Sequence, residues 1–170
     1  MAGNAAEKIF EQLSQEVGRI LLSKGIMLAT AESCTGGWVA QVVTQTSGSS
    51  QWFERGFVTY TNEAKQEMLN VQSSTLERYG AVSEATVKEM AEGALKHSRA
   101  QIALAISGVA GPTGGTAEKP VGMVCFAWAA DNFSTQTTTM HFSGDRQAVR
   151  YQAVQYVLQH LIDLVAVSLP

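Results

Sequence analysis

The sequence predicts an α/β fold in which helices are layered on a sheet, and three observations support this. Apolar runs of strand length alternate with segments whose apolar residues recur at helical spacing. Turns that contain glycine separate many of these segments. Near the C-terminus, two strand-like runs flank the short turn Asp131-Asn132, which indicates an antiparallel hairpin.

The first expected helix spans Ala5–Lys24, where apolar residues such as Leu13 and Val17 recur at helical spacing and Gly25 ends the segment. A short strand over Ile26–Ala31 follows it. The next expected elements are a helix over Trp38–Thr46, a loop over Ser47–Ser50, a strand over Arg55–Tyr60, and helices from Thr61 or Asn62 to Leu69, from Ser74 to Tyr79 and from Ser83 to His97.

The C-terminal part of the chain is expected to complete the sheet and to end in a long amphipathic helix. No internal repeat or linker divides the 170 residues, so we expect one domain over residues 1–170. The last expected elements are a strand over Gln101–Ile106, a glycine-rich loop over Ser107–Gly115, strands over Val121–Ala129 and Thr135–Phe142, and a helix from Gly144–Arg146 to about Val167.

The composition excludes several classes of protein. Twelve Lys and Arg residues against 15 Asp and Glu residues give a net charge of −3, which argues against binding nucleic acid. No apolar run reaches the ~18 residues of a membrane span. The N-terminal segment carries acids and lacks the apolar core of a secretory signal. We therefore expect a soluble, cytoplasmic protein.

Metal and disulfide chemistry are also not expected. Cys34 and Cys125 are too few for a disulfide scaffold or a cysteine-rich zinc site. No His, Cys and Asp cluster has the spacing of metal ligands, so we expect no metal and no cofactor. His97, His141 and His160 lie at helix or strand ends, where none needs a catalytic role.

Four segments with candidate functional residues each follow an expected strand. Ligands of open α/β sheets bind at the carboxyl ends of strands, so this shared placement favours one site built from all four segments. The segments are Ser33–Gly37, Tyr60 with Lys65, Ser107–Gly115 and Gly144–Arg146.

Ser33 lies between an expected strand and an expected helix, where its hydroxyl would project over the edge of the sheet. The amides of Thr35, Gly36 and Gly37 could stabilise an oxyanion there, and the glycines would let a ligand approach the backbone. The flanking residues are not those of the esterase nucleophile elbow. The alternative interpretation is a helix cap followed by a flexible turn.

Lys65 lies in the first turns of an expected helix, where the helix dipole disfavours a cation. Partial burial would lower its pKa and let it act as a general base, and Tyr60 could reach the same cleft. The alternative is an ordinary solvated lysine.

The loop Gly108–Gly115 could hold a phosphate through successive backbone amides, although it has neither the Walker nor the GxGxxG pattern. Arg146 lies at the start of the last helix, where the helix dipole opposes a cation. A bound anion between the two would make this position of the arginine favourable. Arg150, one turn later, could serve instead.

These residues together resemble the CinA C-terminal domain family, and the resemblance covers essentially the whole chain in order. It is nearest to the stand-alone members, which lack the N-terminal domain of longer relatives. The segments that carry it are Thr30–Gly37 (TAESCTGG), Gly56–Tyr60 with Lys65, Ser107–Gly115 (SGVAGPTGG) and Phe142–Arg146.

The resemblance implies a three-layer α/β/α sandwich with a mixed central sheet, a homodimer, and no metal requirement. It also implies hydrolysis of nicotinamide mononucleotide to nicotinate mononucleotide and ammonia, in pyridine-nucleotide recycling. Ser33 would be the nucleophile and Lys65 the general base, assisted by Tyr60. Residue 107 is Ser here, whereas Thr is expected in many relatives. The implied substrate-binding residues are Cys34, Thr35, Gly36, Gly37, Ser107, Gly108, Gly111, Gly114, Gly115 and Arg146.

Three other functions are compatible with the same residues. A non-catalytic nucleotide-binding module would tolerate loss of the Ser33 hydroxyl. A cysteine hydrolase would use Cys34 in place of Ser33. A partner-binding role in DNA uptake is suggested only by the family's name, and the negative net charge of the chain gives it little support.

Overall fold

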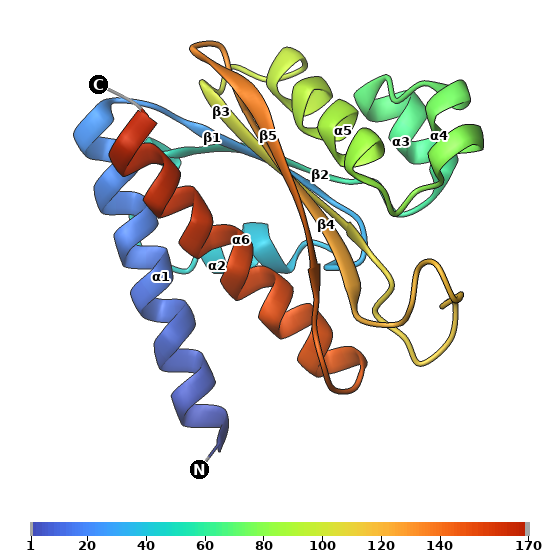
Figure 1. The fold of residues 1–170 in the computed structure, drawn as a ribbon. Coiled ribbons are helices and arrows are strands. Elements are labelled where there is room, and N and C mark those ends of the chain that lie inside the picture. Colours follow the sequence, from blue (N-terminus) through green and yellow to red (C-terminus); the bar gives the residue numbers. More distant parts are fainter. Residues whose placement is uncertain (1, 169–170) are drawn as a thin grey trace.

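The structure, a computed structural model, describes residues 2–168; residue 1 and residues 169–170, the ends of the predicted domain, lie outside the described residues. A five-stranded sheet lies between two layers of helices, as Figure 1 shows. The predicted three-layer α/β/α sandwich is thus confirmed. One layer contains α1 (Ala2–Lys24), α2 (Trp38–Val43) and α6 (Arg146–Ser168), and the other contains α3 (Asn62–Leu69), α4 (Ser73–Tyr79) and α5 (Glu84–Lys96).

The sheet is mixed and has the strand order β2-β1-β3-β4-β5. β1 pairs in parallel with β2 and β3, whereas β4 is antiparallel to both β3 and β5. Consequently β1, β2, β3 and β5 all end at the same edge, where the four candidate segments meet. The strands are β1 (Leu28–Glu32), β2 (Phe53–Val58), β3 (Ile102–Gly108), β4 (Met123–Ala130) and β5 (Phe133–His141).

The two faces of the sheet bury side chains of different size. On β4, Phe126 and Trp128 pack on the face covered by α1, α2 and α6. The alternate positions Ala127 and Ala129 face α5, as the two-residue period of a strand requires. Small residues also let the helices α3 and α5 approach each other closely. At Gly93 of α5, a Cβ atom would lie only 2.0 Å from the Leu69 carbonyl oxygen of α3.

The predicted helix starts are confirmed where a side chain caps the helix. Thr61 accepts a hydrogen bond from the Ala64 amide at the start of α3, and Ser83 accepts one from the Thr86 amide at the start of α5. The hairpin is also confirmed, since β4 and β5 are antiparallel and joined by a turn at Asp131-Asn132.

Several predicted boundaries are wrong by two or three residues, including the starts of α1 and of four of the strands, and the ends of β2 and α2. β2 ends at Val58 and not at Tyr60, because the carbonyls of Thr59 and Tyr60 face the Lys65 ammonium nitrogen. α2 ends at Val43, before the predicted end at Thr46, and a short 3₁₀ helix (η1, Ser49–Gln51) occupies part of the predicted loop.

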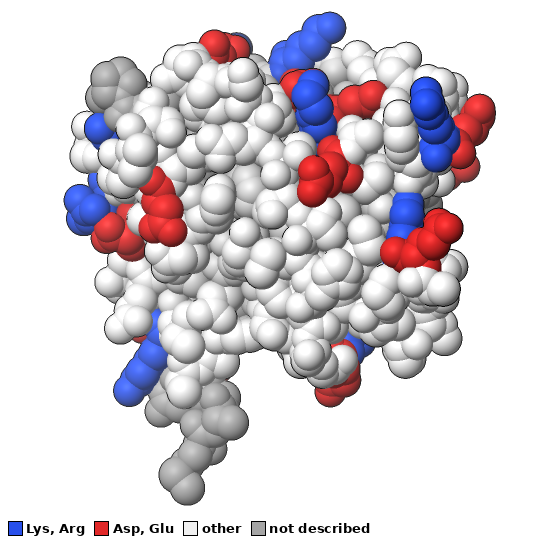
Figure 2. Space-filling model, viewed as in Figure 1, with Lys and Arg blue, Asp and Glu red and all other residues white. Residues whose placement is uncertain are grey.

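The face in Figure 2 carries most of its charged side chains near its margins, while its middle is largely uncharged. No continuous basic surface is visible on this face, in keeping with the net charge of −3. Among the helices that the structure describes, none has the length and apolarity needed to cross a membrane.

Candidate active site

The turn after β1 places Ser33 at the edge of the sheet. The Ser33 amide donates to the Ile106 carbonyl of β3, and the Ser33 carbonyl accepts from the Gly36 amide. Gly36 and Gly37 have φ angles of 60° and 98°, which favour glycine, so their presence permits the tight turn. Since the Gly36 amide is used inside the turn, it is not a free oxyanion donor. Within residues 2–168, the amides of Thr35 and Gly37 have no protein acceptor.

A buried carboxylate holds this turn from the side of α2. Glu32 is 1% exposed, and its Oε1 accepts hydrogen bonds from the Thr35 hydroxyl at 2.6 Å and the Val39 amide at 2.8 Å. Its Oε2 accepts one from the Ala40 amide at 3.1 Å. Glu32 therefore supplies the cap that Gly37 cannot, because α2 starts after a residue without a side-chain acceptor. The sequence reasoning missed this role.

Lys65 reaches the Ser33 hydroxyl from α3. Its Nζ lies 2.9 Å from Ser33 Oγ, 2.8 Å from the Thr59 carbonyl oxygen and 3.3 Å from the Tyr60 carbonyl oxygen. Lys65 is 1% exposed, so it is not the solvated surface lysine of the alternative interpretation. The two residues, 32 positions apart in the sequence, form one buried pair.

Burial lowers the pKa of Lys65 to about 8, because the charged ammonium loses its hydration, and the nearby Cys34 thiol offsets only part of this effect. The three oxygens around Nζ can accept the three N–H bonds of the ammonium, and they also suit the neutral amine that forms above the pKa. Its two N–H groups can donate to the carbonyls of Thr59 and Tyr60, which leaves the lone pair to accept the Ser33 hydroxyl proton. This is the arrangement that a general base needs.

Tyr60 lies beside the pair, but its phenol does not contact Lys65. Tyr60 is 57% exposed, and its hydroxyl oxygen accepts a hydrogen bond of 3.0 Å from Arg146 Nη2. Arg146 also donates from Nη1 to the Gly111 carbonyl at 3.0 Å. Arg146 thus connects the start of α6 with the segment after β2 and the loop after β3.

The loop after β3 borders the same region. Ser107 is buried at the end of the strand, and residues 112–118 are exposed. Within the described residues, the amides of Gly111, Gly114 and Gly115 have no protein acceptor, as expected of a loop that could hold an anion. Beside it is a hollow of about 610 Å³, lined by Ala110, Pro112, Val121, Gly144, Asp145, Arg146, Gln147 and Arg150.

Comparison with known proteins identifies the family. The model of the CinA C-terminal domain matches residues 10–165. The chain belongs to the CinA C-terminal domain family. It is 59% identical over 150 residues to the nicotinamide-nucleotide amidohydrolase PncC of Escherichia coli K12, and this match covers 88% of the chain and 91% of that protein.

Longer and solved members of the CinA family match as well. A putative competence-damage inducible protein of Symbiobacterium thermophilum is 50% identical over 156 residues, which cover 87% of the chain but only 37% of that relative. The crystal structure of the competence/damage inducible protein CihA from Agrobacterium tumefaciens has a TM-score of 0.89 and 45% identity. This match covers 92% of the chain and 95% of that structure.

Within the described residues, no thiol and no histidine is hydrogen-bonded to Ser33 Oγ or to Lys65 Nζ in this CinA domain. Cys34 is buried, and the loss of hydration together with the nearby Glu32 charge raises its pKa to about 12. His160 packs against the Trp128 ring at 4.1 Å, and His97 Nε2 lies 3.4 Å from the Asn70 amide nitrogen. Among residues 2–168, only Lys65 is hydrogen-bonded to Ser33 Oγ.

We expect iodoacetamide to leave the activity of the native protein unchanged. The Cys34 thiol is buried and protonated at neutral pH, and Cys125 is buried as well, so neither presents a thiolate to the reagent. The measurement is the rate of ammonia release before and after treatment, with mass spectrometry to count modified thiols. Inactivation by alkylation of Cys34, together with an active Ser33→Ala variant, would identify a cysteine hydrolase.

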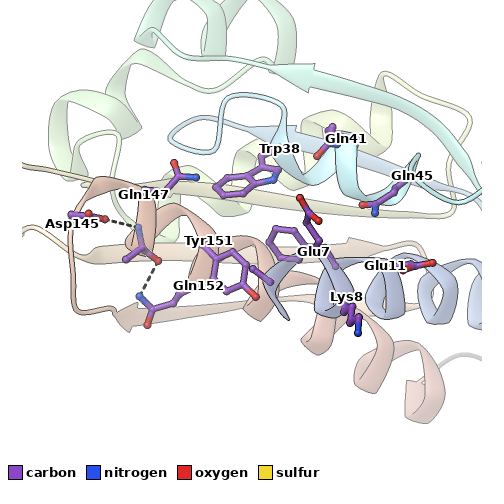
Figure 3. A pocket seen from close by; sticks show the side chains of 13 residues that line it. Glu7, Lys8, Glu11, Trp38, Gln41, Gln45, Asp145, Gln147, Tyr151 and Gln152 are labelled. Atoms are coloured by element: carbon purple, nitrogen blue, oxygen red, sulfur yellow. Dashed lines mark hydrogen bonds between the residues drawn. The ribbon is translucent and has the colours of Figure 1, made fainter. Parts of the chain in front are cut away.

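A second, larger hollow lies away from the Ser33–Lys65 pair. This groove has a volume of about 1130 Å³ and lies between α1, α2 and α6. In Figure 3, Trp38 and Tyr151 form its walls, and polar side chains such as Gln147 lie around them. Neither Ser33 nor Lys65 lines it. In the described part of the chain, no three His, Cys, Asp or Glu side chains gather in a metal-binding arrangement.

Proposed function

We propose that this CinA domain hydrolyses nicotinamide mononucleotide to nicotinate mononucleotide and ammonia, with Ser33 as nucleophile and Lys65 as general base. The observation that carries the proposal is the buried Lys65 amine, 2.9 Å from Ser33 Oγ and paired with two carbonyls. The choice of substrate rests on the 59% identity to a protein named for this amidohydrolase activity.

In the first half of the reaction, neutral Lys65 takes the Ser33 proton while Oγ forms a bond to the carboxamide carbon. Direct transfer over 2.9 Å is favoured over a relay through Tyr60, whose hydroxyl is bonded to Arg146. Free amides of the turn would stabilise the oxyanion, which is worth about 3 kcal/mol per well-placed donor. The carbon–nitrogen bond then breaks, and Lys65 returns its proton to the leaving ammonia.

The second half repeats these steps with water. Lys65, neutral again, takes a proton from a water molecule that attacks the acyl ester carbon. The bond between this carbon and Ser33 Oγ breaks, and the proton on Lys65 returns to the serine oxygen. The products are nicotinate mononucleotide and the unmodified enzyme, so each cycle consumes one water and releases one ammonia.

The ribose phosphate would bind at the other end of the site. Arg146 carries a guanidinium group next to the 610 Å³ hollow, and the free amides of Gly114 and Gly115 lie in the adjoining loop. Binding energy at the phosphate would position the distant carboxamide against Ser33. We further propose that residues 1–170 form one domain and that the protein works as a cytoplasmic homodimer in pyridine-nucleotide recycling.

The direct test is ammonia release by the purified protein. Nicotinamide mononucleotide should be hydrolysed, whereas nicotinamide and nicotinamide riboside, which lack the phosphate, should react far more slowly. Binding of the mononucleotide without ammonia release would support the nucleotide-binding module instead. Hydrolysis of free nicotinamide at an equal rate would contradict the proposed phosphate anchor.

We expect EDTA to leave this activity intact. The proposed chemistry uses a serine, a lysine and backbone amides, and the described residues contain no cluster suited to a metal ion. The measurement is ammonia release after dialysis against the chelator, compared with a buffer-dialysed control. Loss of activity that a divalent cation restores would contradict this mechanism.

A further inference from the structure

Arg150 of α6 contacts the backbone of the nucleophile turn directly. Its Nε donates to the Cys34 carbonyl at 3.0 Å, and its Nη2 donates to the Thr35 carbonyl at 3.2 Å. The guanidinium carbon lies 5.4 Å from the centre of the Trp38 ring, within the range of a cation–π contact. Trp38 itself packs against Phe10 and Tyr151, so the guanidinium rests on a supported aromatic surface that borders the groove of Figure 3.

Such contacts matter because the turn contains two consecutive glycines. Peptide groups next to glycine rotate more easily than others, since glycine adopts positive and negative φ angles with similar ease. Only the Thr35–Gly36 peptide borders a glycine directly, but rotation of it or of the preceding Cys34–Thr35 peptide would reverse a carbonyl and an amide, which point in opposite directions in a trans peptide. Of these two amides, that of Thr35 is the free one, because the Gly36 amide donates to the Ser33 carbonyl. A carbonyl oxygen turned toward the reacting carbon would repel the oxyanion that an amide should stabilise.

We propose that Arg150 is a positioning residue that holds the Cys34–Thr35 and Thr35–Gly36 peptide groups in the orientation needed for catalysis. This inference rests on the proposed function and adds to it a residue that acts through the turn, although its side chain also borders the 610 Å³ hollow. Two of the donor nitrogens of Arg150 are committed to carbonyls of the turn. Arg146, one helical turn earlier, is bonded to Tyr60 and Gly111 and remains the proposed phosphate anchor.

The decisive variant is Arg150→Lys, which keeps the charge but cannot donate to two carbonyls from one planar group. Its kcat should fall about 10- to 100-fold, which is less than the roughly 100- to 1000-fold loss on removing an oxyanion donor, because the donor is displaced and not deleted. Its KM for nicotinamide mononucleotide should change little, because the phosphate anchor is intact. The midpoint of the pH profile should also stay in place, since Arg150 does not contact Lys65. Arg78→Lys is the matched control, because Arg78 is also an arginine stacked on an aromatic ring, 5.2 Å from the Tyr79 ring centre.

A second measurement separates positioning from loss of fold and does not depend on the natural substrate. A fluorophosphonate probe should label Ser33 in wild type and not in Ser33→Ala. In Arg150→Lys, the final extent of labelling should equal that of wild type, which shows a folded site, while the rate of labelling should fall. Guanidinium chloride at millimolar concentration should partly restore the labelling rate of Arg150→Ala.

Different results would overturn different claims. A raised KM with unchanged kcat in Arg150→Lys would make Arg150 a substrate anchor and contradict the positioning role. Unchanged labelling and turnover rates would also contradict it. If wild type labels at Ser33 but releases no ammonia from the mononucleotide, the proposed substrate is wrong. In that case, the labelling rates alone decide the role of Arg150.

Discussion

Replacing Lys65 with arginine is expected to abolish amide hydrolysis. A guanidinium group does not lose its proton in the working pH range, so it cannot accept the proton of Ser33. It would also crowd a position that is 1% exposed and closely surrounded by the Thr59 and Tyr60 carbonyls. We expect a loss of several orders of magnitude in kcat, as for the removal of other members of a catalytic unit. The measurement is the steady-state rate of ammonia release.

The pH profile of the wild-type protein tests the same residue without mutation. The reactive form of Lys65 is the neutral amine, whose fraction rises as the pH rises through its pKa of about 8. Activity should therefore increase about tenfold per pH unit well below pH 8 and level off above it. This profile should be measured as kcat/KM, which reports the pKa values of the free enzyme.

Two controls make the Lys65 result specific. Lys65→Ala should be as inactive as Lys65→Arg, while each still binds the mononucleotide through the phosphate site. Lys88→Arg should behave like wild type, because Lys88 is exposed and its partner Glu92 can pair equally well with arginine. Near-normal turnover by Lys65→Arg would exclude the serine–lysine mechanism and transfer the role of base to another group.

Replacing Ser33 with alanine is expected to remove hydrolysis and to leave nucleotide binding nearly normal. The hydroxyl forms the bond to the substrate, whereas the phosphate would bind at Arg146 and the loop after β3. The turnover rate should fall by several orders of magnitude. Isothermal titration calorimetry with the mononucleotide should give a dissociation constant close to the one measured for Lys65→Ala.

The matched control is Ser134→Ala, since Ser134 is an exposed serine on β5. It should retain the wild-type rate. Residual activity of Ser33→Ala above about a tenth of wild type would exclude Ser33 as the nucleophile, because a lost nucleophile costs far more. If Ser33→Ala binds the mononucleotide as wild type does, and neither protein hydrolyses it, the result would favour a non-catalytic nucleotide-binding module.

Local features of the fold could be predicted because local sequence decides them. Thr61 and Ser83 were predicted near helix starts because a hydroxyl there satisfies a free amide of the first turn. Short apolar runs, as opposed to apolar residues at helical spacing, distinguished strands from helices along most of the chain. The placement of Ser33 and Lys65 after neighbouring parallel strands was also predictable, since such strand ends meet at one edge of the sheet.

The contacts inside the site could not be predicted in the same way. The phenol of Tyr60 was expected to share a proton with Lys65, yet its hydroxyl is bonded to Arg146, 86 positions away. Glu32 and Arg150 received no positioning role, because their partners are mostly backbone groups of the turn. Every residue carries such groups, and sequence patterns do not report which of them remain unpaired.

The sequence by itself thus determined the α/β class, the order of most elements and the set of chemically competent residues near Ser33. Periodicity, caps and glycine turns act over a few residues, which is the range that sequence patterns describe. Only the tertiary structure decided that Lys65 is buried against Ser33 and that its pKa is lowered to about 8. Desolvation and hydrogen bonding depend on what packs around a group, and those neighbours come from distant parts of the chain.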